Sequence, residues 1–165
     1  MKLAVLGGTS QVDQYLLNHA LGSGYSIHFL GPKVNPSVSD PELTVVQGSL
    51  QDVSLIEAAF EDAHAVICLP YAVTDFETLG NVVHTMHAFG IVRLILAADF
   101  YKTEPHQFKN MLQKAGIDWT IIHHGQAAPT GVPNYFAIPD IDYATYLVRQ
   151  VTDVTNLRAA MVLSN

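Results

Sequence analysis

Short apolar runs alternate along this chain with longer segments whose apolar residues recur every three or four positions. The short runs are rich in β-forming residues, and several stop at glycine or proline, as is typical of strands buried on both faces of a sheet. They cover residues 2–7, 25–31, 43–48, 64–70, 92–98, 118–124 and 158–164. The segments with helical spacing cover residues 10–22, 54–60, 74–90, 104–115 and 140–152.

Alternation of strands and helices predicts a mostly parallel sheet with right-handed crossovers, which is a doubly wound α/β fold. Proline-rich stretches at 32–41 and 125–139 are expected to be loops. The second of these is too short to form a separate substrate lobe. We therefore expect residues 1–165 to form a single domain whose substrate pocket is open and shallow.

Composition narrows the partners that this domain can have. Of the 165 residues, 49% are hydrophobic and only 14% are charged, which excludes a disordered chain. So little charge favours a homo-oligomer with an apolar contact face. The formal net charge is −7, and residues 1–92 hold nine acidic side chains against two basic ones. Nucleic acid and anionic membranes are therefore poor partners.

Cysteine and histidine give no sign of a metal centre. The single cysteine, Cys68, lies in the apolar run HAVICL and is expected to be a buried, inert thiol. His84 and His87 share one helix face, but no third ligand accompanies them, so we predict no metal site. The start MKLAVLGG has no long apolar leader segment, and no apolar run reaches membrane-spanning length. We expect a cytoplasmic protein.

In a doubly wound sheet, ligands bind beyond the carboxyl ends of the strands. The first of these ends reads Gly7-Gly8-Thr9-Ser10 and leads directly into a predicted helix. Such a turn presents backbone N–H groups and a helix N-terminus to an anion. It is therefore one of the strand ends at which a ligand is expected.

Several phrases of the sequence resemble a known family. They are KLAVLGGT, VVQGSLQDVSLIEAAFEDAHAVI, GIVRLIL, WTIIHHGQ and IDYATYLV, which together span nearly the whole chain. The chain resembles the atypical short-chain dehydrogenase/reductases, in particular the NmrA-like proteins and the small NAD(P)H-dependent flavin and biliverdin reductases. This resemblance implies a Rossmann-like fold, NADP or NAD as cofactor, and a small planar substrate such as FMN or FAD.

The first turn departs from the family pattern G-A-T-G-x-x-G. Gly7 and Thr9 match, whereas Ser10 replaces the second glycine and Asp13 the third. Ser10 is tolerable if its backbone is ordinary, and its hydroxyl can donate to a phosphate. Asp13 complements the helix dipole but repels a pyrophosphate. At about 6 Å and an effective dielectric constant near 20, that repulsion is roughly 3 kcal/mol, or about 100-fold in affinity.

The resemblance also places the other cofactor contacts. The arginine that grips the NADP 2′-phosphate is replaced by Gly31, so Lys33 either takes over its role or is a solvated loop lysine. The aspartate that contacts adenine is replaced by Ser49. The full set of expected contacts is Gly7, Thr9, Ser10, Gln11, Val12, Lys33, Ser49, Leu50, Leu69, Pro70, Ala97 and Ala98. With so many departures, dinucleotide binding is expected to be weak.

Candidates for catalysis lie after the fifth and sixth strands. His123 and His124 stand where the family has R-P, and imidazole titrates near neutral pH, so they are candidate proton donors. The alternative is a pair of partly buried structural histidines. Tyr101 is the third candidate, although Tyr101-Lys102 is not the Tyr-x-x-x-Lys pair of ordinary short-chain dehydrogenases.

The sequence leaves two functions open. The first is an NAD(P)H-dependent reductase that transfers hydride directly to a planar acceptor, for which a strong general acid is optional. The second is a degenerate Rossmann protein, a pseudoenzyme that binds nucleotide weakly or not at all. Such a protein would act as a sensor or through a protein partner.

Overall fold

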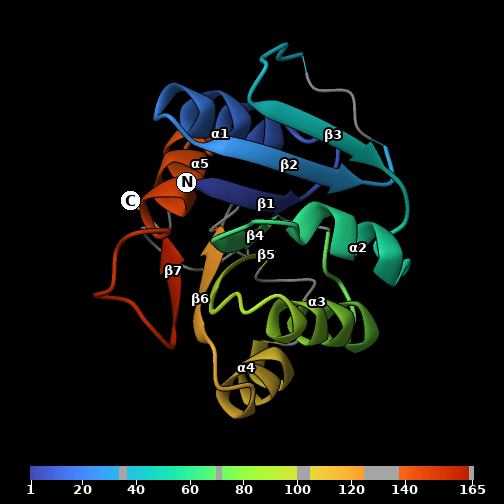
Figure 1. The fold of residues 1–165 in the computed structure, drawn as a ribbon. Helices are drawn as coiled ribbons and strands as arrows, with labels where there is room; N and C mark the ends of the chain where they lie inside the picture. The colour runs from blue at the N-terminus through green and yellow to red at the C-terminus, as the bar shows by residue number, and fades with distance from the viewer. Residues whose placement is uncertain (34–36, 70–71, 100–104, 125–137, 164–165) are drawn as a thin grey trace.

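Seven parallel strands form one sheet at the centre of the computed structural model (Figure 1). The structure describes residues 1–33, 37–69, 72–99, 105–124 and 138–163. Its strands are β1 (Lys2–Leu6), β2 (Ser26–Gly31), β3 (Leu43–Gln47), β4 (Ala65–Cys68), β5 (Arg93–Asp99), β6 (Asp118–His124) and β7 (Ala159–Leu163). Their order in the sheet is β3-β2-β1-β4-β5-β6-β7, and each neighbouring pair is parallel.

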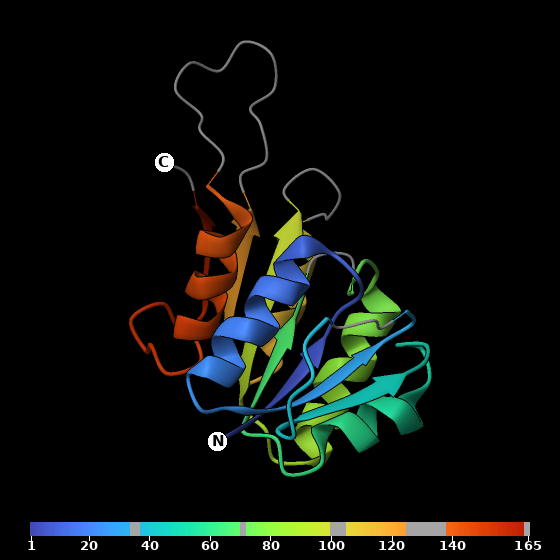
Figure 2. The ribbon, with the colours of Figure 1, turned by 90° about the horizontal axis from the view of Figure 1, so that it is seen from above.

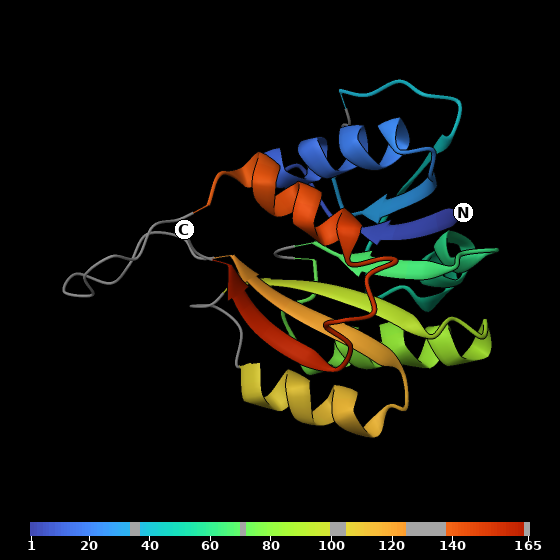
Figure 3. The same ribbon diagram turned by 90° about the vertical axis from the view of Figure 1, so that its left-hand side faces the viewer.

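Helices cover both faces of the sheet. They are α1 (Gln11–Gly22), α2 (Val53–Phe60), α3 (Phe76–Ala88), α4 (Pro105–Lys114) and α5 (Asp140–Arg149). Figure 3 shows α1 and α5 on one face and α2, α3 and α4 on the other. Viewed from above in Figure 2, α1 lies beside α5, and the two helices pack against each other. This is the single doubly wound, Rossmann-like α/β domain that the alternating pattern predicts.

Each central strand supplies both halves of the core, because successive side chains point to opposite faces. In β1, Leu3 and Val5 pack in the cluster that includes α1 and α5, whereas Ala4 and Leu6 pack in the cluster that includes α2 and α3. All four side chains are 0% exposed. A continuous apolar run in the sequence therefore corresponds to a strand covered on both sides.

Successive strands are added on one side of β1 as far as β3, and on its other side from β4 onward. The chain runs from β1 outward through β2 to the edge strand β3, then returns to place β4 on the other side of β1. Crossovers diverge at this point and leave a crevice above the carboxyl ends of β1 and β4, where doubly wound proteins bind their ligands. In the described part of the chain, no helix is long and apolar enough to cross a membrane.

Candidate functional site

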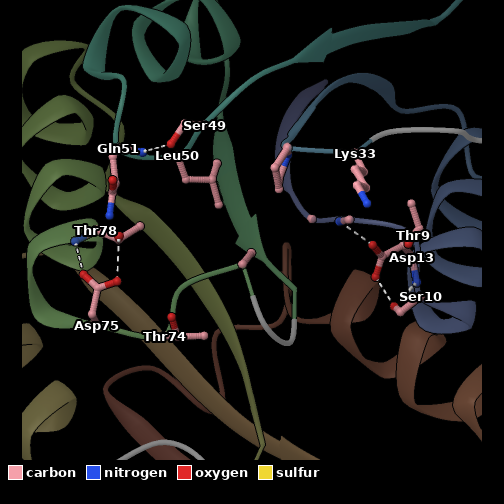
Figure 4. Close-up of a pocket in the computed structure, with 14 residues that line it drawn as sticks. Thr9, Ser10, Asp13, Lys33, Ser49, Leu50, Gln51, Thr74, Asp75 and Thr78 are labelled. Carbon is pink, nitrogen blue, oxygen red and sulfur yellow. Dashed lines mark hydrogen bonds between the residues drawn. The ribbon is translucent and has the colours of Figure 1, made fainter.

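A cavity of about 670 Å³ lies at this crossover point (Figure 4). Four consecutive strand ends contribute to it. Its lining residues are 7–10 and Asp13 after β1, Pro32 and Lys33 after β2, residues 49–51 after β3, and Ala72, Thr74, Asp75 and Thr78 after β4. The cavity thus lies at the carboxyl ends of the strands, where the doubly wound fold predicts ligand binding.

Gly7 makes the turn from β1 into α1 possible. A β-carbon on Gly7 would lie 2.7 Å from Phe29 Cε2 and 2.9 Å from Leu69 Cδ1, closer than carbon atoms approach. The Gly7 N–H also donates to the Leu30 carbonyl oxygen over 3.0 Å, which extends the pairing of β1 with β2. Leu69, an expected cofactor contact, is 0% exposed, packs against Gly7 and does not line the cavity.

Ser10 is the N-cap of α1 and has an ordinary extended backbone, with φ −73° and ψ 161°. Its side-chain oxygen accepts a hydrogen bond from the Asp13 N–H over 3.2 Å. Because φ is negative, the position does not need the conformational freedom of glycine. The condition under which serine is expected to be tolerated here, an ordinary backbone conformation, is therefore met.

Asp13 turns back onto the loop that precedes its helix. Its Oδ2 accepts the Gly8 N–H over 2.5 Å, and its Oδ1 accepts the Ser10 hydroxyl. The side chain is only 1% exposed. Burial raises the pKa of the Asp13 carboxyl above its ordinary value, and the hydrogen bonds from Ser10 and Gly8 oppose that rise. The Ser10 hydroxyl, which the sequence suggests for a phosphate, is thus already used within the chain.

The segments that follow β2 and β3 bring a cation, a hydroxyl and an apolar side chain to the cavity. Lys33 is exposed and lies on the same side of the cavity as Thr9 and Asp13 (Figure 4). Ser49 Oγ accepts the Gln51 N–H over 3.1 Å, which shapes the turn after β3. Leu50, 7% exposed, adds an apolar surface to the cavity. Lys33, Ser49 and Leu50 are all expected contacts, and the structure brings them together.

The start of α3 forms a wall of the cavity that was not predicted from the sequence. Asp75 is the N-cap of this helix and accepts hydrogen bonds from Thr78, over 2.8 Å from N and 3.1 Å from Oγ1. Thr74 and Ala72 complete this wall. An N-cap signal before a helix was available in the sequence, since Asp75 precedes Thr78 by three residues. What the sequence did not indicate is that β4 lies next to β1, which brings the start of α3 to the cavity.

Other expected cofactor contacts do not line the cavity. Gln11 is exposed at the start of α1, and Val12 is packed in the core at 6% exposed. Ala97 and Ala98 on β5 are 3% and 4% exposed and belong to the two core clusters. Pro70 lies outside the described residues, as does Tyr101 among the catalytic candidates.

The two candidate histidines are buried at the end of β6, at 3% exposed for His123 and 5% for His124. His124 Nε2 lies 3.1 Å from the Ile138 carbonyl oxygen and 3.7 Å from Asp140 Oδ1. Its ring stacks on Tyr143 with ring centres 4.3 Å apart. Neither histidine lines the cavity, so these contacts favour the structural alternative for His124.

Within the described residues, no group of three or more His, Cys, Asp or Glu side chains is arranged to hold a metal ion. His87 Nε2 lies 2.8 Å from the Ala115 carbonyl oxygen, which ties α3 to the end of α4. Cys68 is 0% exposed, and burial raises the pKa of its thiol to about 12. The prediction of a buried cysteine is confirmed.

The cavity fits one half of a dinucleotide better than the other. Ser49 and Leu50 offer a hydroxyl and an apolar surface to an adenosine, and Lys33 offers a positive charge to a phosphate on its ribose. At the glycine turn, however, the Asp13 carboxylate already accepts the Gly8 N–H. A pyrophosphate fits this turn only if Asp13 loses its charge or leaves Gly8.

Comparisons with solved structures agree with the fold. A short-chain dehydrogenase/reductase from Veillonella parvula in complex with NADP superimposes with a TM-score of 0.80 at 17% identity, over 99% of this chain and 94% of that chain. A Rossmann-fold NAD(P)-binding family protein from Shigella flexneri gives 0.79 at 11% identity, over 98% and 91%. A nucleoside-diphosphate-sugar epimerase from Staphylococcus aureus gives 0.77 at 16% identity, over 100% and 71%.

Sequence comparison assigns the chain to a family. Curated protein sequences give no match. The profile of the NAD(P)H-binding family, by contrast, matches residues 7–142, from the glycine turn into α5. That match covers most of the chain and includes all of the segments that line the cavity. The chain therefore belongs to the NAD(P)H-binding family.

Proposed function

We propose that this protein is a small NAD(P)H-dependent reductase of the NmrA-like or flavin-reductase-like type. The observation that carries the proposal is the cavity at the β1–β4 crossover point, in a chain whose family profile begins at the glycine turn. A bound nicotinamide supplies a hydride, and the protein need only hold an acceptor ring against it. A planar acceptor such as FMN, FAD or biliverdin suits an open site without a separate lobe.

Each end of the cavity then has a role. Residues 7–10 approach the centre of the dinucleotide, Ser49 faces the adenine, and Lys33 faces the 2′-phosphate of NADP. The hydroxyl and the ammonium group are of the polar and charged kinds that such contacts require. His123 stays a predicted proton donor. We expect His123→Ala to lower turnover and to leave cofactor affinity unchanged.

Calorimetric titration with NADPH and with NADH, at low and moderate salt, tests the proposal. Micromolar binding of either cofactor supports it, and oxidation of NADPH by FMN, FAD or biliverdin then identifies the acceptor. The absence of binding at millimolar cofactor rejects it. A salt series is needed because charge–charge contributions weaken as salt screens them.

One observation favours a second candidate, a protein that has lost dinucleotide binding and acts as a sensor or through a protein partner. The Asp13 carboxylate holds the Gly8 N–H that would otherwise be free for a phosphate. If this charge suppresses binding, Asp13→Gly tightens the affinity for NADPH by about tenfold or more. An unchanged affinity in this variant would reject the electrostatic explanation.

A further inference from the structure

The Asp13 carboxylate lies where a dinucleotide bound at this turn would place its negative charge. Its Oδ2 is 2.5 Å from the Gly8 nitrogen, and the N-terminus of α1 begins two residues earlier at Gln11. We propose that Asp13 takes up one proton when a dinucleotide binds. This proton makes the affinity for pyrophosphate-containing ligands fall as the pH rises, whereas adenosine binds independently of pH. The inference rests on the proposed dinucleotide binding at this cavity.

Two features of the turn make a second anion costly there. The Asp13 side chain is 1% exposed, so little water is available to screen its charge. The groups that donate hydrogen bonds to it, the Gly8 N–H and the Ser10 hydroxyl, are neutral. An arriving phosphate therefore meets an ionised group whose charge no neighbouring hydrogen bond cancels.

A protonated Asp13 changes the chemistry of the turn. The neutral carboxyl carries an O–H group that can donate to Ser10 Oγ or to a phosphate oxygen. Ser10 is then able to direct its own hydroxyl hydrogen towards the ligand. In the free protein the Ser10 hydroxyl donates to the Asp13 carboxylate, whereas protonation of Asp13 leaves either side chain able to donate to the bound phosphate. Burial already raises the pKa of Asp13, which eases this proton uptake.

Among the described residues that line the cavity, Asp13 supplies the carboxyl group nearest the glycine turn. Among the described residues, Lys33 and Asp75 are the other charged side chains that line the cavity, and Figure 4 shows Asp75 on the wall opposite Asp13. Helix α5, which packs on α1, directs its nearby polar groups elsewhere. Asp142, Tyr146 and Arg149 line a separate groove with Leu163, and the Tyr143 hydroxyl donates to the Ile122 carbonyl oxygen. The remaining titratable groups of α1 are Tyr15 and His19.

The test is calorimetric titration of the full chain with NAD⁺ in two buffers of different ionisation enthalpy. NAD⁺ is chosen because it lacks the 2′-phosphate of NADP, which itself titrates at about pH 6. We expect uptake of close to one proton per NAD⁺ at about pH 7, and an affinity that falls by up to about tenfold per pH unit between about pH 5.5 and 7.5. Adenosine, which has no phosphate, should bind without proton uptake.

Two variants of equal charge change complete the experiment. Asp13→Asn keeps the shape and a hydrogen-bond acceptor for Gly8 but removes the charge, so its NAD⁺ affinity should be independent of pH and its proton uptake close to zero. Asp75→Asn removes the other carboxylate of the cavity and should leave the pH slope of the native chain intact. Circular dichroism shows whether each variant is folded.

The outcomes separate this inference from the proposed function. If NAD⁺ binds the native chain without proton uptake, Asp13 stays ionised and swings away from Gly8, and the inference is wrong while the proposed function stands. If the NAD⁺ affinity of Asp13→Asn still falls as the pH rises, another group takes up the proton, and the inference is again wrong. If NAD⁺ binds neither the native chain nor Asp13→Asn at about pH 5.5, both the inference and the proposed function fall.

Discussion

Arg93 Nη2 donates to the Gln150 carbonyl oxygen over 2.6 Å and so joins the start of β5 to the end of α5. The same guanidinium donates to Thr120 Oγ1 over 2.9 Å and to the Asp118 carbonyl oxygen over 3.3 Å, both on β6. Arg93 is 8% exposed, and its burial lowers the pKa of the guanidinium from its ordinary value, although the group stays charged. One side chain therefore fastens α5 to the sheet at the edge remote from the cavity.

Arg93→Met should lower the free energy of unfolding by about 3 kcal/mol, since it leaves buried carbonyl groups without their charged donor. Urea unfolding measures the loss. Arg158→Gln is the matched control, because Arg158 Nε forms an exposed contact of 3.6 Å with Asp118 Oδ1. Such surface pairs contribute about 0–1 kcal/mol, so this variant should unfold almost like the native chain. Equal effects in the two variants would contradict the anchoring role.

Most of the fold could be predicted from periodicity. Strands covered on both faces, such as β1 and β4, appear in the sequence as unbroken apolar runs, and glycine or proline marks several of their ends. The predicted ranges differ from the observed elements by one or two residues at most ends. What periodicity does not contain is the order of strands, because the return of β4 to the side of β1 depends on long-range packing.

The candidate site was only partly predictable for the same reason. Gly7, Lys33 and Ser49 follow strand ends in the sequence, so their placement at the cavity was foreseeable. Asp13 was expected to repel a pyrophosphate, but its hydrogen bond to Gly8 depends on the path of the turn. His124 Nε2 contacts the carbonyl oxygen of Ile138, fourteen residues further along the chain, and no local pattern predicts that contact.

Lys33 should distinguish the two nicotinamide cofactors. It is the exposed cation among the described residues that line the cavity, and the 2′-phosphate is the group by which NADPH differs from NADH. Lys33→Ala is expected to weaken NADPH by about tenfold, because a charge-assisted contact is lost, and to leave NADH nearly unchanged. Lys114→Ala on α4 is the control of equal charge. If Lys33→Ala weakens both cofactors equally, Lys33 does not contact the 2′-phosphate.

Asp13 should also make stability depend on pH. Its pKa is raised in the folded protein above the unfolded value of 3.8, so the unfolded chain releases this proton at lower pH than the folded one. The native chain should therefore lose stability relative to Asp13→Asn as the pH rises from the unfolded to the folded pKa, and the difference should be constant above that range. Urea unfolding of both variants at a series of pH values isolates this contribution, because every other titrating group is shared. A difference that grows in the opposite direction would show that the folded pKa lies below 3.8.

Cys68 should be silent towards thiol reagents in the folded protein. It ends β4, is 0% exposed, and burial raises the pKa of its thiol to about 12, so almost none of it is the reactive thiolate at neutral pH. A chromogenic disulfide reagent should therefore modify no thiol in native buffer and one thiol per chain in guanidinium chloride. Because Cys68 packs beside Leu6 and Leu96 in the core, slow modification in native buffer should follow the rate of global opening. Stoichiometric labelling within seconds would show that the end of β4 opens without unfolding, which the packing at this position does not allow.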